Sequence, residues 1–443
     1  MDLEKLLILL DDWVVESRGQ GLIPQQKEIF RRSWEGQEYD DMEISRYSTD
    51  YIKKMLAPKL WKLLSEVIGE PVTKNTLRIV IEPALKVRSR QQHSLKPLQW
   101  KIWSDDAPEL SVFYGYADEL NTLEQWIVTD RCRLVALGGM VGVGKTAIAV
   151  KLARQIQDSF QFVIWRSLRG SPPLQNILAD LLESFSDCTE TTLPGTSVSD
   201  VSRLMECLRS HRCLVILDGV ETILETSQLA GRYREGYQDY GQLFRQIGEL
   251  NHQSCLVLTC SEKLRVIDLM ADRNSPVRYY KLEGLKKDAA KQILKDRELV
   301  EEPEWKSLIE RYEGNPLLLR IVATTILEIF NGRASDFIRQ NTIFLGNQLT
   351  EELDRQFERI SQVEIEVMYQ LALDPQPLTR SQLRENIPSS PSSSQVTESL
   401  QSLAWRSLIE KITIGGDSLF TLRPIIKKYV LNRFNQQSNI SKQ

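Results

Sequence analysis

The chain has 443 residues, enough for two to four domains, and its 26% charged and 42% hydrophobic residues are typical of globular proteins. Its net charge of −4 argues against binding nucleic acid through overall charge. The six cysteines contain no C-x-x-C pair and the three histidines are scattered, which argues against a disulfide framework and a zinc site. No apolar run approaches the ~18 residues of a membrane span. The acidic start lacks a signal-cleavage pattern, so we expect a cytoplasmic protein.

Residues 1–85 are predicted to form an all-α domain. One helix is expected from about Pro24 to Trp34, and a longer one after Ser48 or Thr49, either of which can cap it. Pro58 is expected to kink or split the longer helix. Its apolar stripe is formed by Ile52, Leu56, Leu60, Leu63 and Val67, and the residues expected to face the other way are Tyr51, Lys54, Trp61 and Lys62. The whole segment resembles the N-terminal helix-turn-helix domain of bacterial signalling NTPases.

Two roles are open for this N-terminal domain. Its outward aromatic and basic residues would suit contact with DNA phosphates. A group of acidic residues lies just upstream of them and leaves the segment nearly charge-balanced: Glu35, Glu38, Asp40, Asp41 and Glu43. Because a DNA-binding module usually has a clear basic excess, docking to a protein or a purely structural role is favoured over DNA binding.

Residues 86–108 are predicted to be a linker, because the hydrophobic pattern weakens and polar residues accumulate there. An apolar and aromatic stretch from Val112 to Tyr116 follows it. This stretch precedes a predicted helix from Asp118 to Trp126.

The stretch LVALGGMVGVGKT, residues 134–146, carries the most specific motif. Its apolar start predicts a short buried strand, and the spacing G-x-x-x-x-G-K-T from Gly139 to Thr146 opens an apolar helix, which is the pattern of a phosphate loop. Glycines let backbone N–H groups turn toward phosphate oxygens. Lys145 can reach the β- and γ-phosphates, and the Thr146 hydroxyl can bind Mg²⁺. The strand–loop–helix context disfavours the alternative of a glycine-rich turn with an unrelated lysine.

Buried strands and helices alternate after this loop. Strands are predicted at Phe162–Trp165, Cys213–Asp218, Cys255–Thr259 and Arg278–Leu282. Asp218 ends its strand as the acidic residue that holds Mg²⁺ through water does in phosphate-loop enzymes. Thr259 ends the next strand and can sense the γ-phosphate or the attacking water. Near-continuous apolar strands joined by helices predict a parallel sheet covered on both faces, over residues 109–283.

Two further domains are predicted. Residues 284–345 read as helical, with Pro316 at the start of a helix after Gly314-Asn315. Residues 346–434 contain three helices and a hairpin around Gly415-Gly416, which together predict a winged helix. Residues 435–443 read as a polar tail. The fold class is therefore multidomain, α/β with all-α domains on either side.

The order of these parts resembles the NB-ARC group of STAND signalling NTPases, closest to cyanobacterial members. The matching stretches are FYGYADELNTLEQWI, LVALGGMVGVGKTAIAVKLA, LVILDGVETIL, GYQDYGQLFRQIG, SCLVLTCSEK, GNPLLL and SLIEK…FTLRPIIKKYV. The resemblance implies that the NTPase, helical and winged-helix domains fold round ADP in an inactive monomer. Exchange for ATP would then open the monomer and drive oligomerisation, and the N-terminal domain would deliver the output.

The resemblance also implies roles for single residues. Phe113, Tyr114 and Gly115 would lie beside the adenine or ribose, and Pro316 would pack on the base. Arg423 stands where a histidine often contacts the ADP phosphate. The phosphates and Mg²⁺ would be held by Gly139, Val141, Gly142, Val143, Gly144, Lys145, Thr146 and Ala147, with Thr146 and Asp218 at the metal. The residues implied in catalysis are Lys145, Asp218, Glu221 and Thr259.

Several positions depart from the family pattern. Tyr116 and Ser261 stand where the family often has arginine, and Gly219 replaces a second acidic residue, which leaves Glu221 as the nearest carboxylate. One charge-assisted hydrogen bond contributes ~1.5–3 kcal/mol, a large part of the ~5.5 kcal/mol that a full switch requires. We therefore expect nucleotide binding with weak ATP hydrolysis at most. No internal repeat is apparent, so we expect the domains present or a separate partner to sense the signal.

Three functions remain as alternatives. The favoured one is an ATP/ADP switch that forms homo-oligomers and signals to a partner protein or to DNA. The second is a structural adaptor that holds ADP and never cycles, which the departures at Ser261, Gly219 and Arg423 favour. The third is a housekeeping ATPase acting on nucleic acid, which the charge balance disfavours. No membrane contact is expected.

Overall fold

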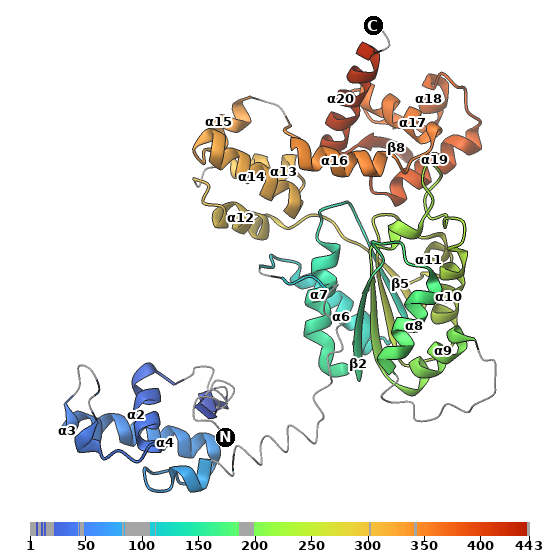
Figure 1. Cartoon of the computed structure of the whole chain (residues 1–443). Coiled ribbons are helices and arrows are strands. Elements are labelled where there is room, and N and C mark those ends of the chain that lie inside the picture. Colours follow the sequence, from blue (N-terminus) through green and yellow to red (C-terminus); the bar gives the residue numbers. More distant parts are fainter. Residues whose placement is uncertain are drawn as a thin grey trace. The chain divides into compact units, whose positions relative to one another are not determined.

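The computed structural model divides the chain into two compact units, residues 1–98 and 99–443. The residues that the structure describes are 6–7, 10–11, 13–14, 22–42, 44, 48–81, 84, 107–110, 112–185, 199–300, 303–340 and 343–440. Most of the predicted linker, residues 86–108, lies outside these ranges. Figure 1 shows the chain with its elements labelled, and each unit is considered by itself below.

The first unit is helical, as predicted. Helix α2 covers Pro24–Trp34, and α3 (Thr49–Tyr51) begins after Ser48, whose hydroxyl accepts a hydrogen bond from the Tyr51 amide. A π-helical turn, Ile52–Leu56, leads into α4 (Ala57–Ile68), with Pro58 in its first turn. Proline lacks the amide hydrogen and clashes with the preceding helical turn, so the widened turn before Pro58 accommodates it.

The predicted outward face of this helix was wrong at Trp61. Tyr51, Lys54 and Lys62 are exposed, but Trp61 is buried and its Nε1–H donates to the Tyr39 hydroxyl at 2.8 Å. A π turn adds one residue to the helical repeat, which rotates the following side chains by about 100° relative to a regular helix. The apolar face therefore moves onto Leu60, Trp61 and Leu64.

The second unit contains a five-stranded parallel sheet of order β2-β3-β4-β1-β5. The sheet confirms the predicted phosphate-loop architecture, and Val277–Lys281 is its fifth strand. The strands are β1 (Leu134–Gly138), β2 (Phe162–Ser167), β3 (Cys213–Asp218), β4 (Cys255–Thr259) and β5 (Val277–Lys281). This order places β4 between β1 and β3, so the carboxyl ends of these three strands lie side by side.

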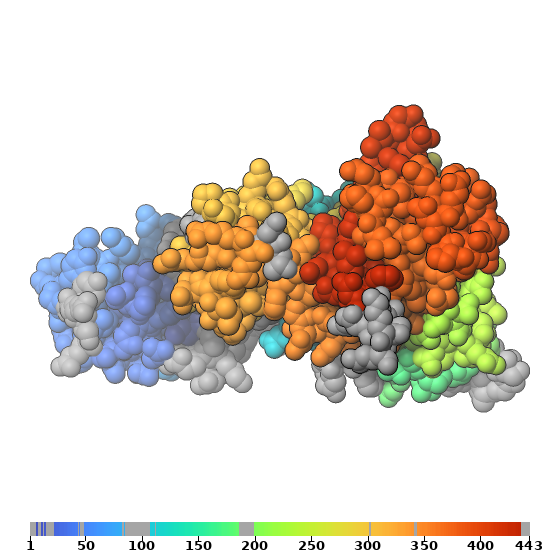
Figure 2. Space-filling view, turned by 90° about the horizontal axis from the view of Figure 1, so that it is seen from above, coloured from blue at the N-terminus to red at the C-terminus, as the bar shows by residue number. Residues whose placement is uncertain are grey.

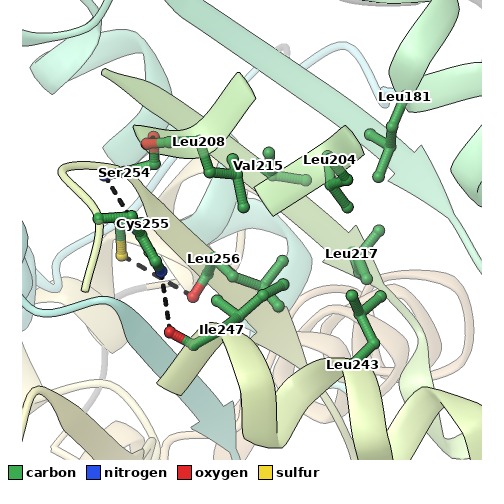
Figure 3. Close-up of a pocket in the computed structure, with 11 residues that line it drawn as sticks. Leu181, Leu204, Leu208, Val215, Leu217, Leu243, Ile247, Ser254, Cys255 and Leu256 are labelled. Carbon is green, nitrogen blue, oxygen red and sulfur yellow. Dashed lines mark hydrogen bonds between the residues drawn. The ribbon is translucent and has the colours of Figure 1, made fainter. Parts of the chain in front are cut away.

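Helices cover both faces of the sheet (Figure 1). Alternate residues of each strand enter two separate cores. One core contains α6 (Ala117–Glu124) and α7 (Lys145–Ile156), and the other contains α8 (Leu174–Phe185), α9 (Asp200–Ser210), α10 (Gln238–Glu249) and α11 (Arg265–Met270). In the second core, Ser254 and His252 border a cavity of about 10 Å³ that is lined mostly by leucines (Figure 3).

Four helices follow the sheet: α12 (Lys287–Asp296), α13 (Trp305–Arg311), α14 (Pro316–Phe330) and α15 (Ala334–Arg339). They share the first core with α7. Helix α14 begins at Pro316 as predicted, capped by the Asn315 side chain, which accepts hydrogen bonds from the amides of Leu317 and Leu318.

The remaining chain forms helices round a small antiparallel sheet of order β6-β8-β7, with strands β6 (Leu378–Thr379), β7 (Ile409–Ile414) and β8 (Asp417–Leu422). Its helices are α16 (Gly346–Phe357), α17 (Gln362–Leu373), α18 (Arg380–Asn386), α19 (Ser393–Trp405) and α20 (Pro424–Ile440). These orange and red residues form much of the surface in the view from above (Figure 2). The hairpin matches the prediction, whereas α20 extends past 435 because no glycine or proline stops it.

Among the described residues, no helix has the length and apolar character needed to cross a membrane. The predicted boundaries inside the second unit, at 283, 345 and 434, stay predictions. The same holds for the interpretation of residues 346–434 as a winged helix.

Candidate nucleotide-binding site

The loop between β1 and α7 has the backbone of a phosphate cradle. Gly139, Gly142 and Gly144 all have positive φ, and α7 begins directly after Gly144. A Cβ on Gly142 would lie 2.6 Å from the Leu317 side chain, and one on Gly139 would lie 2.6 Å from the Leu282 carbonyl oxygen. Only glycine allows the loop to turn this tightly against its neighbours. Within the described chain, no side chain caps the first amides of α7.

Lys145, the first residue of α7, folds back over this loop. Its half-buried ammonium donates to the carbonyl oxygens of Gly139 and Met140 at 2.8 and 3.1 Å. Burial lowers the pKa of Lys145 below its ordinary value, although the carboxylates of Glu221 and Asp218 act in the opposite direction. A cation held by two neutral carbonyls can exchange them for the oxygens of an anion.

Three hydroxyl and carboxyl groups meet at the neighbouring strand ends. The Thr146 hydroxyl donates to Asp218 Oδ1 at 2.7 Å, and the Thr259 hydroxyl donates to the same oxygen at 2.6 Å. Asp218 and Thr259 are buried, and Thr259 also accepts a hydrogen bond from the Gly219 amide at 3.0 Å. Asp218 and Thr259 end the neighbouring strands β3 and β4, and Thr146 lies in the first turn of α7, which follows β1 through the phosphate loop. A hydroxyl and a carboxylate are oxygen ligands of the kind that Mg²⁺ requires.

Glu221 lies at the same edge of the sheet but is already engaged. Its Oε2 accepts a hydrogen bond from the backbone amide of Ser261 at 3.1 Å. Ser261 itself is buried directly after β4 and Cys260. Glu221 therefore supports the turn that follows the sensor strand through one of its two carboxylate oxygens.

The aromatic stretch before α6 packs beside the loop. Phe113 and Tyr114 are partly buried against the first core, and the Tyr114 hydroxyl donates to Asp296 at 2.9 Å. Gly115 has a φ of 62°, and a Cβ there would lie 2.7 Å from Ala289. The Tyr116 hydroxyl donates to the Val143 carbonyl oxygen of the phosphate loop at 2.6 Å. This stretch thus joins the loop to α12.

The start of α14 contacts the phosphate loop from the other side. The Asn315 side-chain amide donates to the Val141 carbonyl oxygen at 2.9 Å, and the Leu317 amide donates to the Gly142 carbonyl oxygen at 3.3 Å. Pro316 lies between these two contacts. Asn315 is 2% exposed, so its hydrogen bonds are shielded from water.

Arg423 belongs to an ion cluster that we call the Arg423 cluster, formed with Glu283 and Glu313. Its guanidinium lies 2.5 Å from Glu313 and 3.0 Å from Glu283. Burial works against the charge of Arg423, but the two carboxylates outweigh it and raise the pKa of Arg423 above its ordinary value. In this structure the charge of Arg423 is therefore neutralised by protein carboxylates, and its implied contact with a nucleotide phosphate stays a proposal.

A second ion cluster lies just past β4, and we call it the Glu262 cluster: Glu262, Arg359, Arg406 and Glu364. Glu262 Oε1 lies 2.5 Å from Arg359, and Oε2 lies 3.2 Å from Arg406. Arg406 also lies 3.8 Å from Glu364, and both carboxylates are at most 2% exposed. The Lys263 amide adds a hydrogen bond to the Trp405 carbonyl oxygen at 3.1 Å. These contacts attach α16 and α19 to the end of the sensor strand.

The geometry fits a nucleotide triphosphate or diphosphate with Mg²⁺. The loop offers backbone amides and a lysine, and Thr146 and Asp218 offer oxygens on the adjoining side. Within the described ranges, no group of three or more His, Cys, Asp or Glu side chains is arranged to hold a metal ion. A metal here would therefore rely on phosphate oxygens and water as its remaining ligands.

Sequence reasoning missed three residues at this site. Asn315 was read as part of a helix-start signal, and Tyr116 as a departure from the family pattern. Arg169 received no role, although its guanidinium lies 3.5 Å from Asp218 Oδ2. The order of parallel strands could have placed the end of β2 beside Asp218. The contacts of Tyr116 and Asn315 carry no sequence signal because their partners are backbone carbonyls.

Comparisons with family models match two segments of the chain. Residues 1–84 match the N-terminal helix-turn-helix domain of vWA-MoxR associated proteins. Residues 116–231 match the NB-ARC domain, which covers the phosphate loop and Asp218. The matches confirm the resemblance inferred from the sequence.

A WD repeat-containing protein of Nostoc sp. is 40% identical over 361 residues, which are 79% of this chain and 28% of that protein. The chain thus spans under a third of the length of this relative. Among solved structures, a Walker-type ATPase of Pyrococcus abyssi is 16% identical with a TM-score of 0.49, and covers 72% of this chain and 96% of its own. A STAND protein with a tetratricopeptide repeat sensor from Pyrococcus horikoshii is 17% identical with a TM-score of 0.40, covering 75% and 44%.

Proposed function

Because residues 116–231 match the NB-ARC domain and residues 1–84 match an N-terminal helix-turn-helix domain, we propose that this chain is a switch controlled by bound ATP or ADP. Nucleotide state would control how the NTPase, helical and winged-helix domains open and whether copies of the chain assemble. The N-terminal domain would deliver the output. Every residue role and domain movement below belongs to this proposal.

The observation that carries the proposal is the shared contact of Thr146 and Thr259 with one carboxylate oxygen of Asp218, at 2.7 and 2.6 Å. Thr146 belongs to the phosphate loop and Thr259 to the sensor strand. A change in the Mg²⁺ and phosphate ligands of Thr146 and Asp218 would therefore alter the hydrogen bond of Thr259 directly.

A route from this site to the rest of the unit supports a switch. Asn315 and Leu317 bond to the carbonyls of Val141 and Gly142, so α14 contacts the same loop that would hold the phosphates. Glu313, two residues before Asn315, is paired with Arg423. Phosphate binding that shifts the loop would therefore move the start of α14 through two hydrogen bonds. The ion pair of Glu313 would pass this movement on to Arg423.

We propose that hydrolysis is weak. A general base must reach the proton it removes, usually within about 3 Å or through one water. Glu221 is the nearest carboxylate to Asp218 in sequence, and it is already bonded to the Ser261 amide. Asp218 accepts two hydroxyl hydrogen bonds on one oxygen. Neither carboxylate is poised as a base in this conformation.

For the output, the contacts favour protein docking over DNA binding. Four described lysines of the first unit lie within hydrogen-bonding distance of a carboxylate: Lys27 of Asp11, Lys53 of Asp40, Lys54 of Asp50 and Lys74 of Glu38. Trp61, expected on the outer face, is buried. These pairs remove much of the positive charge that phosphate contact would require.

The second candidate is an adaptor that holds ADP without cycling. The Glu262 cluster favours it, because its buried ion pairs join residues after 284 to the segment that follows β4. The Arg423 cluster favours it as well, because buried Arg423 pairs with the partly exposed Glu283, which follows β5. Breaking such contacts is unfavourable, so an adaptor would keep one conformation whatever nucleotide is present.

Nucleotide release and exchange test the proposal. The nucleotide in the purified, denatured chain is identified by chromatography, and particle size is measured before and after incubation with Mg²⁺-ATP. A switch exchanges ADP for ATP and grows in size, whereas an adaptor retains ADP and keeps its size. Failure to hold or take up any nucleotide would contradict both.

A lysine pair provides the matched control. Lys145→Ala removes the loop cation, and nucleotide affinity is expected to fall by about a hundredfold or more, because the lysine contacts two phosphates. Lys151→Ala changes an exposed lysine one and a half turns along the same helix and should leave affinity unchanged. Equal effects of the two variants would contradict the assigned role of Lys145.

A further inference from the structure

Arg169 places a positive charge at the Mg²⁺ side of the site. It lies two residues after β2, and its guanidinium is 3.5 Å from Asp218 Oδ2, the oxygen that Thr146 and Thr259 leave open. Its side chain is 70% exposed. A Cβ on Gly219 would lie 3.2 Å from Arg169 Cγ, so the glycine after Asp218 leaves room for the stem of this arginine.

The backbone that carries Arg169 is fixed to the segment after Asp218. The Leu168 amide donates to the Asp218 carbonyl oxygen at 2.8 Å, and the Thr222 hydroxyl donates to the Leu168 carbonyl oxygen. Ser171 donates to the Thr222 carbonyl oxygen at 3.0 Å. The start of the side chain is thus held in place, while the exposed guanidinium is free to change partners.

ATP differs from ADP by a terminal phosphate, whose oxygens carry additional negative charge between the phosphate-loop lysine and the Mg²⁺ ion. A site that tells the two nucleotides apart needs a charge-assisted donor that reaches this phosphate and not the inner ones. The Mg²⁺ side is defined here by Asp218. Arg169 approaches Asp218 from the end of β2, which is an edge strand of the sheet. Lys145 follows β1, which lies on the other side of β3 and β4 in the strand order.

Several other described cations near the strand ends already have close carboxylate partners, and Arg265 donates to the Ala230 carbonyl oxygen at 3.3 Å. Arg359 and Arg406 pair with Glu262, Arg423 pairs with Glu313, and Lys263 pairs with Asp268 at 2.5 Å. All four are at least four-fifths buried on the side chain, in contrast to Arg169. Arg169 makes a longer, solvent-exposed contact, which it can exchange at small free-energy cost.

We propose that Arg169 is the residue by which this site distinguishes ATP from ADP. When Mg²⁺-ATP is bound, the guanidinium leaves Asp218, whose carboxylate then serves the metal, and donates to the terminal phosphate. This inference rests on the proposed nucleotide-binding function. It assigns the specificity for the third phosphate to the loop after β2, because position 261 carries a serine with no charge.

Binding affinities of the full chain for Mg²⁺-ATP and Mg²⁺-ADP test the assignment. Arg169→Ala is expected to weaken ATP binding by about tenfold to a hundredfold, the range for one charge-assisted contact, and to change ADP binding less than twofold. Arg169→Lys keeps the charge without the planar fork and should fall between Ala and wild type. Arg203→Ala, an exposed arginine paired with Asp200 on α9, is the matched control.

The outcomes separate this inference from the function it rests on. Equal losses for ATP and ADP would overturn it, because Arg169 would then only hold Asp218 in position for the metal. Unchanged affinity for both nucleotides would overturn it as well. A wild-type chain that binds neither nucleotide would instead remove the proposed function. Thermal unfolding of Arg169→Ala is measured in parallel, so that a loss of stability from removing the ion pair of the buried Asp218 carboxylate is separated from a loss of affinity.

Discussion

The phosphate loop and the Glu262 cluster lie at the same edge of the sheet but hold their charges in opposite ways. Lys145 rests on two neutral carbonyls and remains half-buried. Glu262 is 2% exposed and is shared by two arginines. A neutral carbonyl partner is exchanged easily for a phosphate. Removing a buried counter-charge, in contrast, leaves its partner as an unpaired buried charge, which costs much more free energy. The first arrangement suits a ligand site, and the second suits a fixed attachment.

The Arg423 cluster lies between these extremes. Arg423 is buried, but the side chains of Glu313 and Glu283 are 20% and 55% exposed. Water can therefore partly replace the ion pairs when they open. This comparison ranks the clusters by the free energy needed to open them, and the variants below test the ranking.

The largest loss of stability is expected at Glu262. Glu262→Ala leaves Arg359 buried without its counter-charge and Arg406 with only the longer contact to Glu364, which should lower the free energy of unfolding by about 3–5 kcal/mol. Chemical denaturation of the full chain measures this loss. Glu206→Ala, at an exposed glutamate on α9, is the control and should change stability by less than about 0.5 kcal/mol.

Removing the charges together gives a sharper test. Glu262→Met combined with Arg406→Leu should recover part of the stability lost in Glu262→Ala, because the most buried arginine no longer carries an unpaired charge. Arg359 still lacks Glu262 in this variant, and Glu364 keeps only its hydrogen bonds from Ser361 and Ser402. A double variant that is no more stable than Glu262→Ala would show that the packing of the cluster matters more than its charge.

A smaller loss, about 2–3 kcal/mol, is expected for Arg423→Ala, because charged hydrogen bonds to two carboxylates disappear. The loss should depend on pH. Burial raises the pKa of Glu313 despite Arg423, whereas Lys281 and Arg423 together outweigh burial and lower the pKa of Glu283. Removing Arg423 therefore raises the pKa of both carboxyls.

A carboxyl whose folded pKa is raised loses stabilising free energy as pH rises through that pKa. The deficit of Arg423→Ala should thus be smallest below pH 4.5, the ordinary carboxyl value, and largest near neutral pH. Chemical denaturation of the wild type and of Arg423→Ala, from below pH 4.5 to neutral pH, measures this deficit. A deficit that stays constant with pH would mean that Arg423 acts through packing and not through these two carboxylates.

The contact between α14 and the phosphate loop should contribute less again. Asn315→Ala removes a helix cap and the hydrogen bond to Val141, with an expected loss of about 1–2 kcal/mol. Asn315→Asp keeps the cap but cannot donate to the Val141 carbonyl oxygen. If the loop contact matters for the switch, the Asp variant should retain most of the stability and still change the ADP–ATP exchange rate. Equal exchange rates in Asn315→Asp and wild type would show that the hydrogen bond from Asn315 to the loop has no part in nucleotide exchange.

The sequence predicted the parts of the site that obey local rules. The phosphate loop, Asp218 and the start of α14 at Pro316 each follow from a short motif. The ion clusters could not be predicted, because Glu262 and Arg406 are far apart in sequence and meet only through the packing of α19 on the sensor strand. Trp61 was misplaced because a single π turn shifts every later residue round the helix. Arg169 needed the strand order, which fixes the neighbour of Asp218.

The smallest loss of stability is expected at His252, a titratable group whose ring hydrogen bonds in the described chain both go to neutral backbone groups. It borders the small cavity beside Ser254, and its Nε2 lies 2.8 Å from the Ile247 carbonyl oxygen. Nδ1 accepts a hydrogen bond from the Ser254 amide at 3.2 Å, which fits a neutral ring with its hydrogen on Nε2. Burial lowers the pKa of His252 below 6.5.

His252→Gln should lower the free energy of unfolding by about 1 kcal/mol at neutral pH, through the two hydrogen bonds. A group with a lowered folded pKa adds stability above its unfolded pKa and loses it as pH falls through the folded value. The wild type should therefore lose its advantage over the variant below pH 6.5, because its unfolded state takes up a proton that the folded ring refuses. Parallel stability curves would contradict a neutral buried ring. They would also remove the distinction drawn here, because the folded ring would then take up a proton among neutral partners as readily as the unfolded chain does.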